Sequence, residues 1–173
     1  GRALIFGHNA YVGNPSDEDT GKLLINAVKW CGNSDKPKVG VCGTSADTFL
    51  TSKGFKVTKL KDYDAKDLKK IDVLIVNGNS MTDAEGEALT DFIKNGGGFI
   101  GGCTGWAWDQ GEGGRTLNDD HPGNRALRPV GLAWTTMSFP DQLRSFEARV
   151  DLPSMMNAAE AVAALRKQQT GTA

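Results

Sequence analysis

The stretch DVLIVNGNSMTDAEGEALTDFIKNGGGFIGG, Asp72–Gly102, contains a complete strand–helix–strand unit. It begins with Asp72–Asn77, an apolar run without alternation that is typical of a parallel strand covered on both faces. The spacing of apolar residues then predicts a helix over Thr82–Asn95, in which the first residue and Glu85 form a capping box. Glycines end this helix, and Phe99–Gly102 follows as the next strand. The unit therefore predicts a parallel βαβ crossover.

Strands and helices also alternate in the part of the chain that precedes this unit. Strands are predicted over Ala3–Gly7, Lys38–Cys42 and Lys56–Leu60, with helices at about Asp17–Cys31 and Thr44–Lys53 between them. Five strands alternating with helices predict a doubly wound, mostly parallel α/β sheet, a flavodoxin-like three-layer sandwich. The third strand alternates polar and apolar residues, which suits the edge of a sheet. The predicted strand order is 3-2-1-4-5.

The length of 173 residues fits one domain. Residues 1–105 form its predicted core. Residues 106–167 comprise a loop-rich excursion, with many Gly, Asp and Asn residues, and a C-terminal helix at about Ser154–Lys167. Residues 168–173 are assigned to a tail. The sequence shows no repeat and no second core.

The composition argues against several classes of function. The net charge is -1, with both signs mixed along the chain and no basic stripe, which argues against nucleic acid as a partner. The longest apolar runs are too short to span a bilayer, so membrane insertion is not expected. No phosphate-binding glycine loop follows a strand, and no cysteine or histidine spacing indicates a metal site. We therefore expect neither a cofactor nor a metal.

The sharpest chemical feature is Cys103, in the G-x-C-x-G pattern of Gly101–Gly105 directly after a strand. This pattern resembles the nucleophile elbow of class I glutamine amidotransferases, a tight and strained turn that lifts the nucleophile above the sheet. A thiolate nucleophile needs a histidine base, and the two candidates are His121 and His8. The H-x-E motif that those enzymes carry downstream of the cysteine is absent. Cys103 is thus either a catalytic nucleophile or a small residue in an inherited tight turn.

Ligands of open α/β sheets bind beyond the carboxyl ends of the strands, near the point where the strand order reverses. For the predicted order this point lies between the first and fourth strands. His8 can orient a ligand there or hydrogen-bond its own loop. Trp106 can stack on a sugar ring if it is exposed, or close the end of the sheet if it is buried. The candidate ligand-binding residues are Asn9, Tyr11, Asn77, Asn79, Thr104 and Trp106.

Several motifs resemble one known family when taken in order. They are Ala3–Tyr11, Leu24–Trp30, Gly96–Gly102 and His121–Arg125, the last leading to Gly131–Trp134. Together they are similar to the amidotransferase-like domain that precedes the metallopeptidase domain in enhancin-like and TRP channel-associated factor proteins. In that family the hydrolytic centre is a zinc H-E-x-x-H motif in another domain, and many members act on glycoproteins. The present chain has no such motif.

The resemblance implies a non-catalytic accessory domain of a larger protein, which binds an adjacent domain, a protein partner or a carbohydrate-like ligand. It predicts a buried or unreactive Cys103 that is too far from His8 and His121 for either to act as its base. The alternative is a cysteine-dependent amidase or glutaminase-type hydrolase, which requires the Cys103 side chain within about 4 Å of a histidine ring. The family analogy implies a secreted protein, whereas the free cysteines Cys31 and Cys42 suit a reducing compartment.

Overall fold

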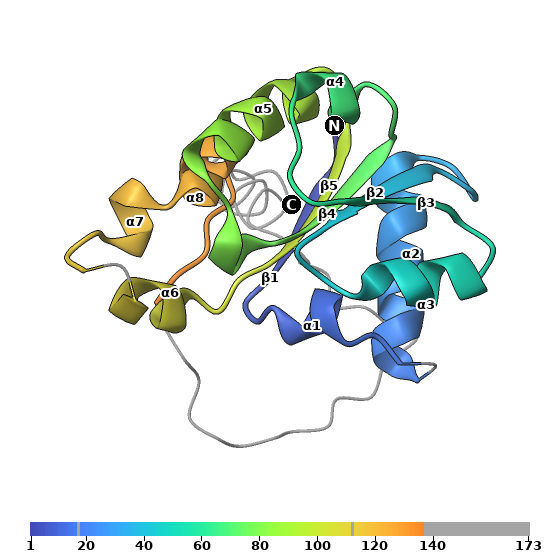
Figure 1. The fold of residues 1–173 in the computed structure, drawn as a ribbon, viewed down its shortest axis with the longest axis horizontal. Helices are drawn as coiled ribbons and strands as arrows, with labels where there is room; N and C mark the ends of the chain where they lie inside the picture. Colours follow the sequence, from blue (N-terminus) through green and yellow to red (C-terminus); the bar gives the residue numbers. More distant parts are fainter. Residues whose placement is uncertain (17, 112, 137–173) are drawn as a thin grey trace, which may run out of the picture. The chain divides into compact units, whose positions relative to one another are not determined.

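The computed structural model describes residues 1–16, 18–111 and 113–136 (Figure 1). The chain divides into two units, Gly1–Ser138 and Phe139–Ala173, and every feature below belongs to the first. The predicted helix at Ser154–Lys167 and the predicted tail 168–173 lie outside the described residues. The assignment of 1–173 to one domain therefore stays a prediction.

The five strands are β1 (Ala3–Phe6), β2 (Lys38–Cys42), β3 (Lys56–Leu60), β4 (Val73–Asn77) and β5 (Gly98–Gly102). The longer helices are α2 (Asp19–Gly32), α3 (Ala46–Ser52), α5 (Asp83–Lys94) and α6 (Gly105–Gly111). The shorter helices are α1 (Ala10–Gly13), α4 (Ala65–Leu68), α7 (Leu117–Asp120) and α8 (Pro122–Leu127), with 3-10 turns η1 (Gly78–Ser80) and η2 (Arg128–Val130).

All strand pairs are parallel, and the strand order is β1-β5-β4-β2-β3. The predicted α/β class and the edge position of β3 are confirmed. The predicted order 3-2-1-4-5 is wrong, because β1 lies at the other edge and pairs with β5, Ala3 opposite Phe99. The strand order consequently reverses between β2 and β4, and not between β1 and β4 as predicted.

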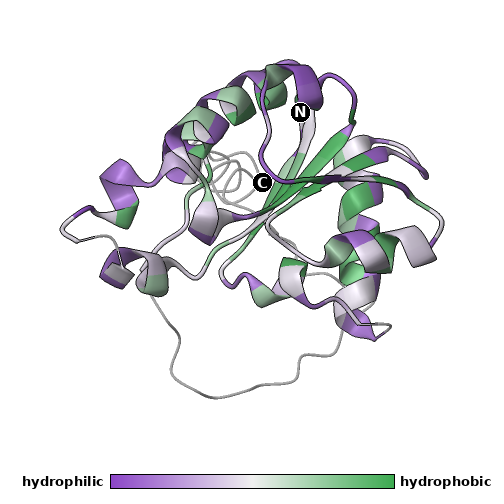
Figure 2. Cartoon of the chain, viewed as in Figure 1, coloured by the Kyte–Doolittle hydropathy of each residue, from purple (hydrophilic) through white to green (hydrophobic). Residues whose placement is uncertain are grey.

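Helices cover both faces of the sheet (Figure 1). Helices α1, α2 and α3 lie on one face, and α4, α5 and α8 lie on the other. Each face buries its own apolar cluster, one centred on Leu24, Val41 and Ile75 and the other on Leu74, Leu89 and Phe99. Figure 2 shows hydrophobic colour along the central strands and hydrophilic colour over α7. The three layers are those of a doubly wound sandwich.

The predicted capping box of α5 is present. The hydroxyl of Thr82 accepts the backbone N–H of Glu85, and the Glu85 carboxylate accepts the Thr82 N–H at 2.8 Å. Glu85 is buried, and its Oε1 lies 3.9 Å from the Sγ of Cys42 on β2. The cap satisfies donors that the first turn of a helix leaves without intrahelical partners. It therefore fixes where α5 begins relative to the end of β4.

The stretch after β5 is more regular than its composition predicts. It contains α6, α7, α8 and η2 in place of a long loop. The buried side chains of Trp108, Leu117 and Leu127 join the core cluster on the α5 face. Short buried segments held by side-chain caps escape a composition-based prediction because they lack a long apolar period. Among the described residues, no helix combines the length and apolarity needed to cross a membrane.

Candidate functional site

Cys103 follows the end of β5, and its side chain is completely buried. It packs beside Gly78, where an added Cβ would lie 2.9 Å from the Cβ of Cys103 and 3.1 Å from the ring of Trp134. The lack of a side chain at Gly78 is therefore what admits both neighbours. Burial raises the pKa of the Cys103 thiol from 9.0 to about 12. The thiol stays neutral at physiological pH.

The glycines around Cys103 serve close packing. Among the described residues, Asn33 is the one non-glycine residue with a positive φ, so Cys103 does not adopt the left-handed backbone conformation. A Cβ at Gly101 would lie 2.7 Å from Trp134, and one at Gly102 would lie 2.9 Å from the backbone of Asn9. Cys103 therefore lacks the backbone strain that the elbow interpretation predicted. The glycines allow neighbouring segments to approach the strand end.

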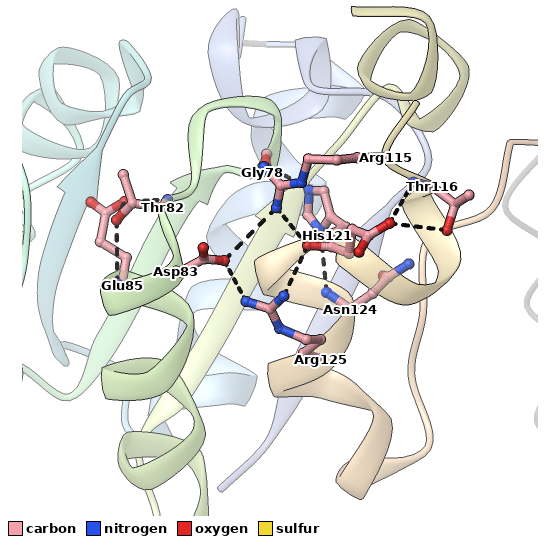
Figure 3. Close-up of polar contacts among 10 residues, drawn as sticks. Gly78, Thr82, Asp83, Glu85, Arg115, Thr116, His121, Asn124 and Arg125 are labelled. Atoms are coloured by element: carbon pink, nitrogen blue, oxygen red, sulfur yellow. Dashed lines mark hydrogen bonds and ion pairs between the residues drawn. The ribbon is translucent and has the colours of Figure 1, made fainter. Parts of the chain in front are cut away.

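His121 caps the start of α8 from a fully buried position (Figure 3). Its Nδ1 accepts the backbone N–H of Asn124 at 3.1 Å, and its Nε2 lies 3.0 Å from the carbonyl oxygen of Gly78. Because a carbonyl oxygen only accepts, Nε2 carries the proton. The ring also makes edge contacts with Trp108 and Trp134, at centroid distances of 4.8 and 5.4 Å. These contacts fix both the tautomer and the orientation of the imidazole.

Cys103 and His121 are brought together, with Sγ and Nε2 3.8 Å apart. This distance meets the requirement of the hydrolase hypothesis and contradicts the prediction that His121 is too far away. The hydrogen bonds nevertheless oppose proton transfer. A base needs a lone pair on the nitrogen that faces the thiol, and Nε2 presents its proton to Gly78. In a catalytic triad, the ring nitrogen that faces away from the nucleophile donates to an acidic side chain. In this chain that nitrogen, Nδ1, instead accepts the backbone N–H of Asn124.

The backbone N–H that can hold an oxyanion in an elbow already has a partner. The N–H of Thr104 donates to Oδ1 of Asn79 at 2.9 Å, and Nδ2 of Asn79 donates to the carbonyl of Thr104 at 3.3 Å. The Thr104 hydroxyl donates to Oδ1 of Asn9 at 3.1 Å. These three predicted ligand-binding residues therefore meet and bind one another. Their network joins the carboxyl ends of β1, β4 and β5.

The other predicted site residues lie nearer the surface. His8 is exposed, and its Nδ1 accepts the N–H of Ala10 at 3.0 Å. This contact agrees with the interpretation that His8 hydrogen-bonds its own loop. Asn77 caps η1 by accepting the N–H of Asn79 at 3.2 Å. The side chains of Tyr11 and Trp106 are exposed by 42% and 47%. Of the predicted set, Asn9, Asn79 and Thr104 thus form a closed junction, and the other residues lie outside it.

Asn124 and Trp134 contact His121 and were missed as functional residues. Asn124 is 1% exposed and uses its side-chain amide to hold the backbone of Leu117 and Trp134. The indole N–H of Trp134 donates to the carbonyl of Phe6 at 2.9 Å. The motif His121–Arg125 was visible in the sequence, but no pattern within it indicates which backbone groups it binds.

The fold and this junction define a class: a doubly wound α/β domain in which an elbow-like turn is sealed by packing and hydrogen bonds. Among the described residues, no group of three or more His, Cys, Asp or Glu side chains is placed to hold a metal ion. The family model described as "TRPM8, N-terminal domain" (TCAF_N) matches residues 1–148. The chain belongs to this family of N-terminal domains of TRPM8 channel-associated factors.

Individual relatives agree with this assignment. The chain is 30% identical to TRPM8 channel-associated factor 2 of Bos taurus over 141 residues, which cover 78% of the chain and 14% of the relative. It is 29% identical over 136 residues to a TRPM8 channel-associated factor homolog of Danio rerio, covering 76% of the chain and 14% of the relative. The chain thus spans about one seventh of the length of these proteins. The predicted kinship with channel-associated factors is confirmed.

A solved structure shares the fold. It is described as IMPa from Pseudomonas aeruginosa in complex with an O-glycopeptide, and it superposes with a TM-score of 0.52 at 20% identity. The match covers 77% of the present chain and 16% of IMPa. This level of identity shows a common fold. The relation to glutamine amidotransferases stays a prediction.

Proposed function

We propose that the chain is a non-catalytic accessory domain, derived from an amidotransferase-like fold, that binds a protein partner. The observation that carries this proposal is that two groups which catalysis at Cys103 would need are already hydrogen-bonded to other parts of the chain. The Thr104 N–H is bonded to Asn79, and the His121 Nε2 proton points to a carbonyl. Both groups would have to exchange partners before amide chemistry at Cys103. The catalytic alternative has no comparable support.

The partner proposed is an ion channel of the TRPM8 type, because the relatives are named channel-associated factors. An adjacent domain of a longer chain is the second candidate, since the chain spans about one seventh of those relatives. In both cases the proposal concerns a protein surface. A carbohydrate ligand at the exposed aromatic side chains is a further alternative.

The carboxyl edge of the sheet supplies a suitable surface. Tyr11 and Trp106 are exposed there, on the helices that follow β1 and β5. The ring of Tyr11 stacks on Phe6 with centroids 5.2 Å apart, so it is held in place before any partner binds. Tyrosine and tryptophan are enriched at the centres of protein interfaces. We assign the partner contact to this edge.

Binding of a purified TRPM8-type channel in detergent tests the proposal. We expect the Tyr11→Ala and Trp106→Ala double variant to bind at least about tenfold more weakly than the natural chain, as hot-spot residues do. Trp30→Ala is the matched control, because Trp30 is 51% exposed but lies on α2. We expect it to bind like the natural chain.

Other results would separate the alternatives. Equal channel binding by all variants would reject the carboxyl edge as the contact. Saturable binding of an O-glycopeptide that depends on Trp106, without channel binding, would favour the carbohydrate alternative. Hydrolysis of glutamine amides that is lost in Cys103→Ala would reject the non-catalytic assignment.

A further inference from the structure

The outer side of β1 carries backbone hydrogen-bonding groups that no described strand pairs with. On the inner side, the carbonyls of Arg2 and Phe6 accept N–H groups of β5 at 2.9 and 3.2 Å. Neighbouring residues of a strand direct their N–H and C=O groups to opposite sides, and the register of β1 with β5 fixes which side each residue uses. Both backbone groups of Ala3 and of Ile5 therefore point away from β5.

The β1 edge lacks the features that protect an exposed strand from pairing with another chain. The strand Ala3–Phe6 contains no charged residue and no proline, and its four side chains are all partly exposed. The opposite edge strand, β3, carries the exposed side chains of Lys56 and Lys59. Charged side chains, lysine above all, keep an edge strand from pairing. The edge of the sheet that is open to a further strand is therefore β1.

Exposed apolar side chains on α2 lie beside the same edge. Nη1 of Arg2 donates to the carbonyl of Trp30 at 2.8 Å, and the Arg2 guanidinium lies 5.4 Å from the centre of the Trp30 ring. Trp30 is thus next to the residue that precedes β1. Leu23 lies about two helical turns earlier on the same face of α2. Leu23 and Trp30 are exposed by 42% and 51%. The apolar surface of β1 therefore continues onto α2.

We propose that a second copy of this chain pairs with β1, so that the two β1 strands run antiparallel about a twofold axis. An axis at Leu4 places Ala3 opposite the partner's Ile5, and these two residues exchange both of their backbone hydrogen bonds. The symmetry repeats the exchange, so every outward group of Ala3 and Ile5 is satisfied. The two sheets become one continuous sheet. This inference goes beyond the proposed function, because it requires no channel.

The antiparallel arrangement suits two copies of this chain. It places Arg2 beside the partner's Phe6, so the two arginines lie at opposite ends of the strand pair and no like charges meet along it. On the same face Leu4 meets the partner's Leu4. The twofold axis also reverses α2, which brings Trp30 towards the partner's Leu23. The net charge of -1 opposes the association of two copies only weakly.

Sedimentation equilibrium of the 173-residue chain tests the proposal. We expect a monomer–dimer equilibrium with a dissociation constant of about 1–100 μM. Ala3→Pro removes an outward N–H and keeps the bonds to β5, as proline does at an edge strand. It should weaken the dimer at least about tenfold, because each copy loses a hydrogen bond. Trp30→Ala should weaken it to a similar extent. Val130→Ala, at an exposed apolar residue on η2, is the matched control and should dimerise like the natural chain.

Cross-linking tests the register of the pair. Opposite residues in a non-hydrogen-bonded antiparallel pair have Cα atoms about 4.5 Å apart, which is within the range of disulfides. Oxidation of Leu4→Cys with copper–phenanthroline should therefore give a covalent dimer. Ile5→Cys is the matched control and should stay uncross-linked, because Ile5 lies opposite the partner's Ala3. The natural thiols are buried and should not compete; they are Cys31, Cys42 and Cys103. Circular dichroism checks that each variant is folded.

A natural chain that stays monomeric up to about 1 mM would overturn the proposal and leave the outer side of β1 to a strand of another protein. A dimer that folded Ala3→Pro and Trp30→Ala leave unchanged would also overturn it, because its contact would lie elsewhere. Equal cross-linking of Leu4→Cys and Ile5→Cys would reject the register. Folded, monomeric Ala3→Pro should still bind a TRPM8-type channel, so the dimer and the channel contact can fail separately.

Discussion

The side-chain amide of Asn124 makes three hydrogen bonds inside the core. Its Nδ2 donates to the carbonyls of Leu117 and Trp134 at 2.9 and 3.0 Å, and its Oδ1 accepts the Trp134 N–H at 2.8 Å. Its backbone N–H donates to His121. Because Asn124 is 1% exposed, water has little access to replace these partners. This one residue therefore joins α7, α8 and the segment that carries Trp134.

We expect Asn124→Ala to lower the free energy of unfolding by about 3 kcal/mol or more, because two carbonyls and one N–H lose their partners in a buried place. Urea unfolding followed by circular dichroism measures this change. Asn118→Ala, at an exposed asparagine on α7, is the control and should stay within about 0.5 kcal/mol of the natural chain. Equal effects of the two substitutions would contradict the bracing role of Asn124.

At the level of single residues, the sequence indicated which residues belong to the candidate site but not how they are hydrogen-bonded. The hydrolase alternative placed Cys103 beside a histidine, and Cys103 and His121 do lie 3.8 Å apart, whereas the accessory-domain interpretation placed them too far apart. The sequence did not reveal the tautomer of His121, which depends on backbone groups of Gly78 and Asn124 that are 43 and 3 residues away. Glycines beside Cys103 look the same in a sequence whether they permit a strained turn or close packing.

Among the elements, β2 and β3 begin and end at the predicted residues, whereas β1 was misplaced in the sheet. The apolar run of β1 suggested a central strand. Its side chains do pack on both faces, Ala3 and Ile5 into one cluster and Leu4 and Phe6 into the other. An apolar pattern reports which faces are covered and not how many strands lie alongside. β3 lies at an edge as its polar pattern predicted, and its exposed residues Lys56, Thr58 and Lys59 are distributed over both of its faces.

Helices α5 and α8 approach each other at Gly86, and this contact gives a prediction with an unusual sign. A Cβ at Gly86 would lie 2.8 Å from the carbonyl oxygen of Pro122, a backbone atom that cannot rotate away. Gly→Ala in a helix interior normally stabilises by up to about 1 kcal/mol. We expect Gly86→Ala to destabilise the domain instead, by about 1–3 kcal/mol.

The control for this prediction is Gly13→Ala at the end of α1. No atom lies within 4 Å of a Cβ built at Gly13, and its φ is not positive. We expect this variant to be as stable as the natural chain or slightly more stable. Thermal unfolding of both variants compares them, and a stabilised Gly86→Ala would show that α5 and α8 are packed less closely than the structure indicates.

At the scale of the whole molecule, four buried acidic groups link stability to pH. Burial raises the pKa of Cys103 to about 12 and that of Cys31 to about 11. Burial, followed by the charge of Glu85, raises the pKa of Cys42 to about 11 and raises that of Tyr63. Each group keeps its proton in the folded state after the unfolded chain has lost it. The stability they contribute is therefore complete below about pH 9 and declines as the pH rises towards the folded pKa values.

The contribution of Cys103 to this decline can be isolated. Between about pH 8 and pH 10.5 we expect the free energy of unfolding of Cys103→Ala to fall by about 1–2 kcal/mol less than that of the natural chain, because one proton fewer is released on unfolding. Urea unfolding at the two pH values measures both slopes. Ile93→Val removes buried apolar volume without a titrating group, so it should lower stability at both pH values and keep the natural slope. If Cys103→Ala also kept the natural slope, the folded Cys103 thiol would ionise as readily as in the unfolded chain. The sealed elbow, and with it the argument against a reactive thiolate, would then have to be abandoned.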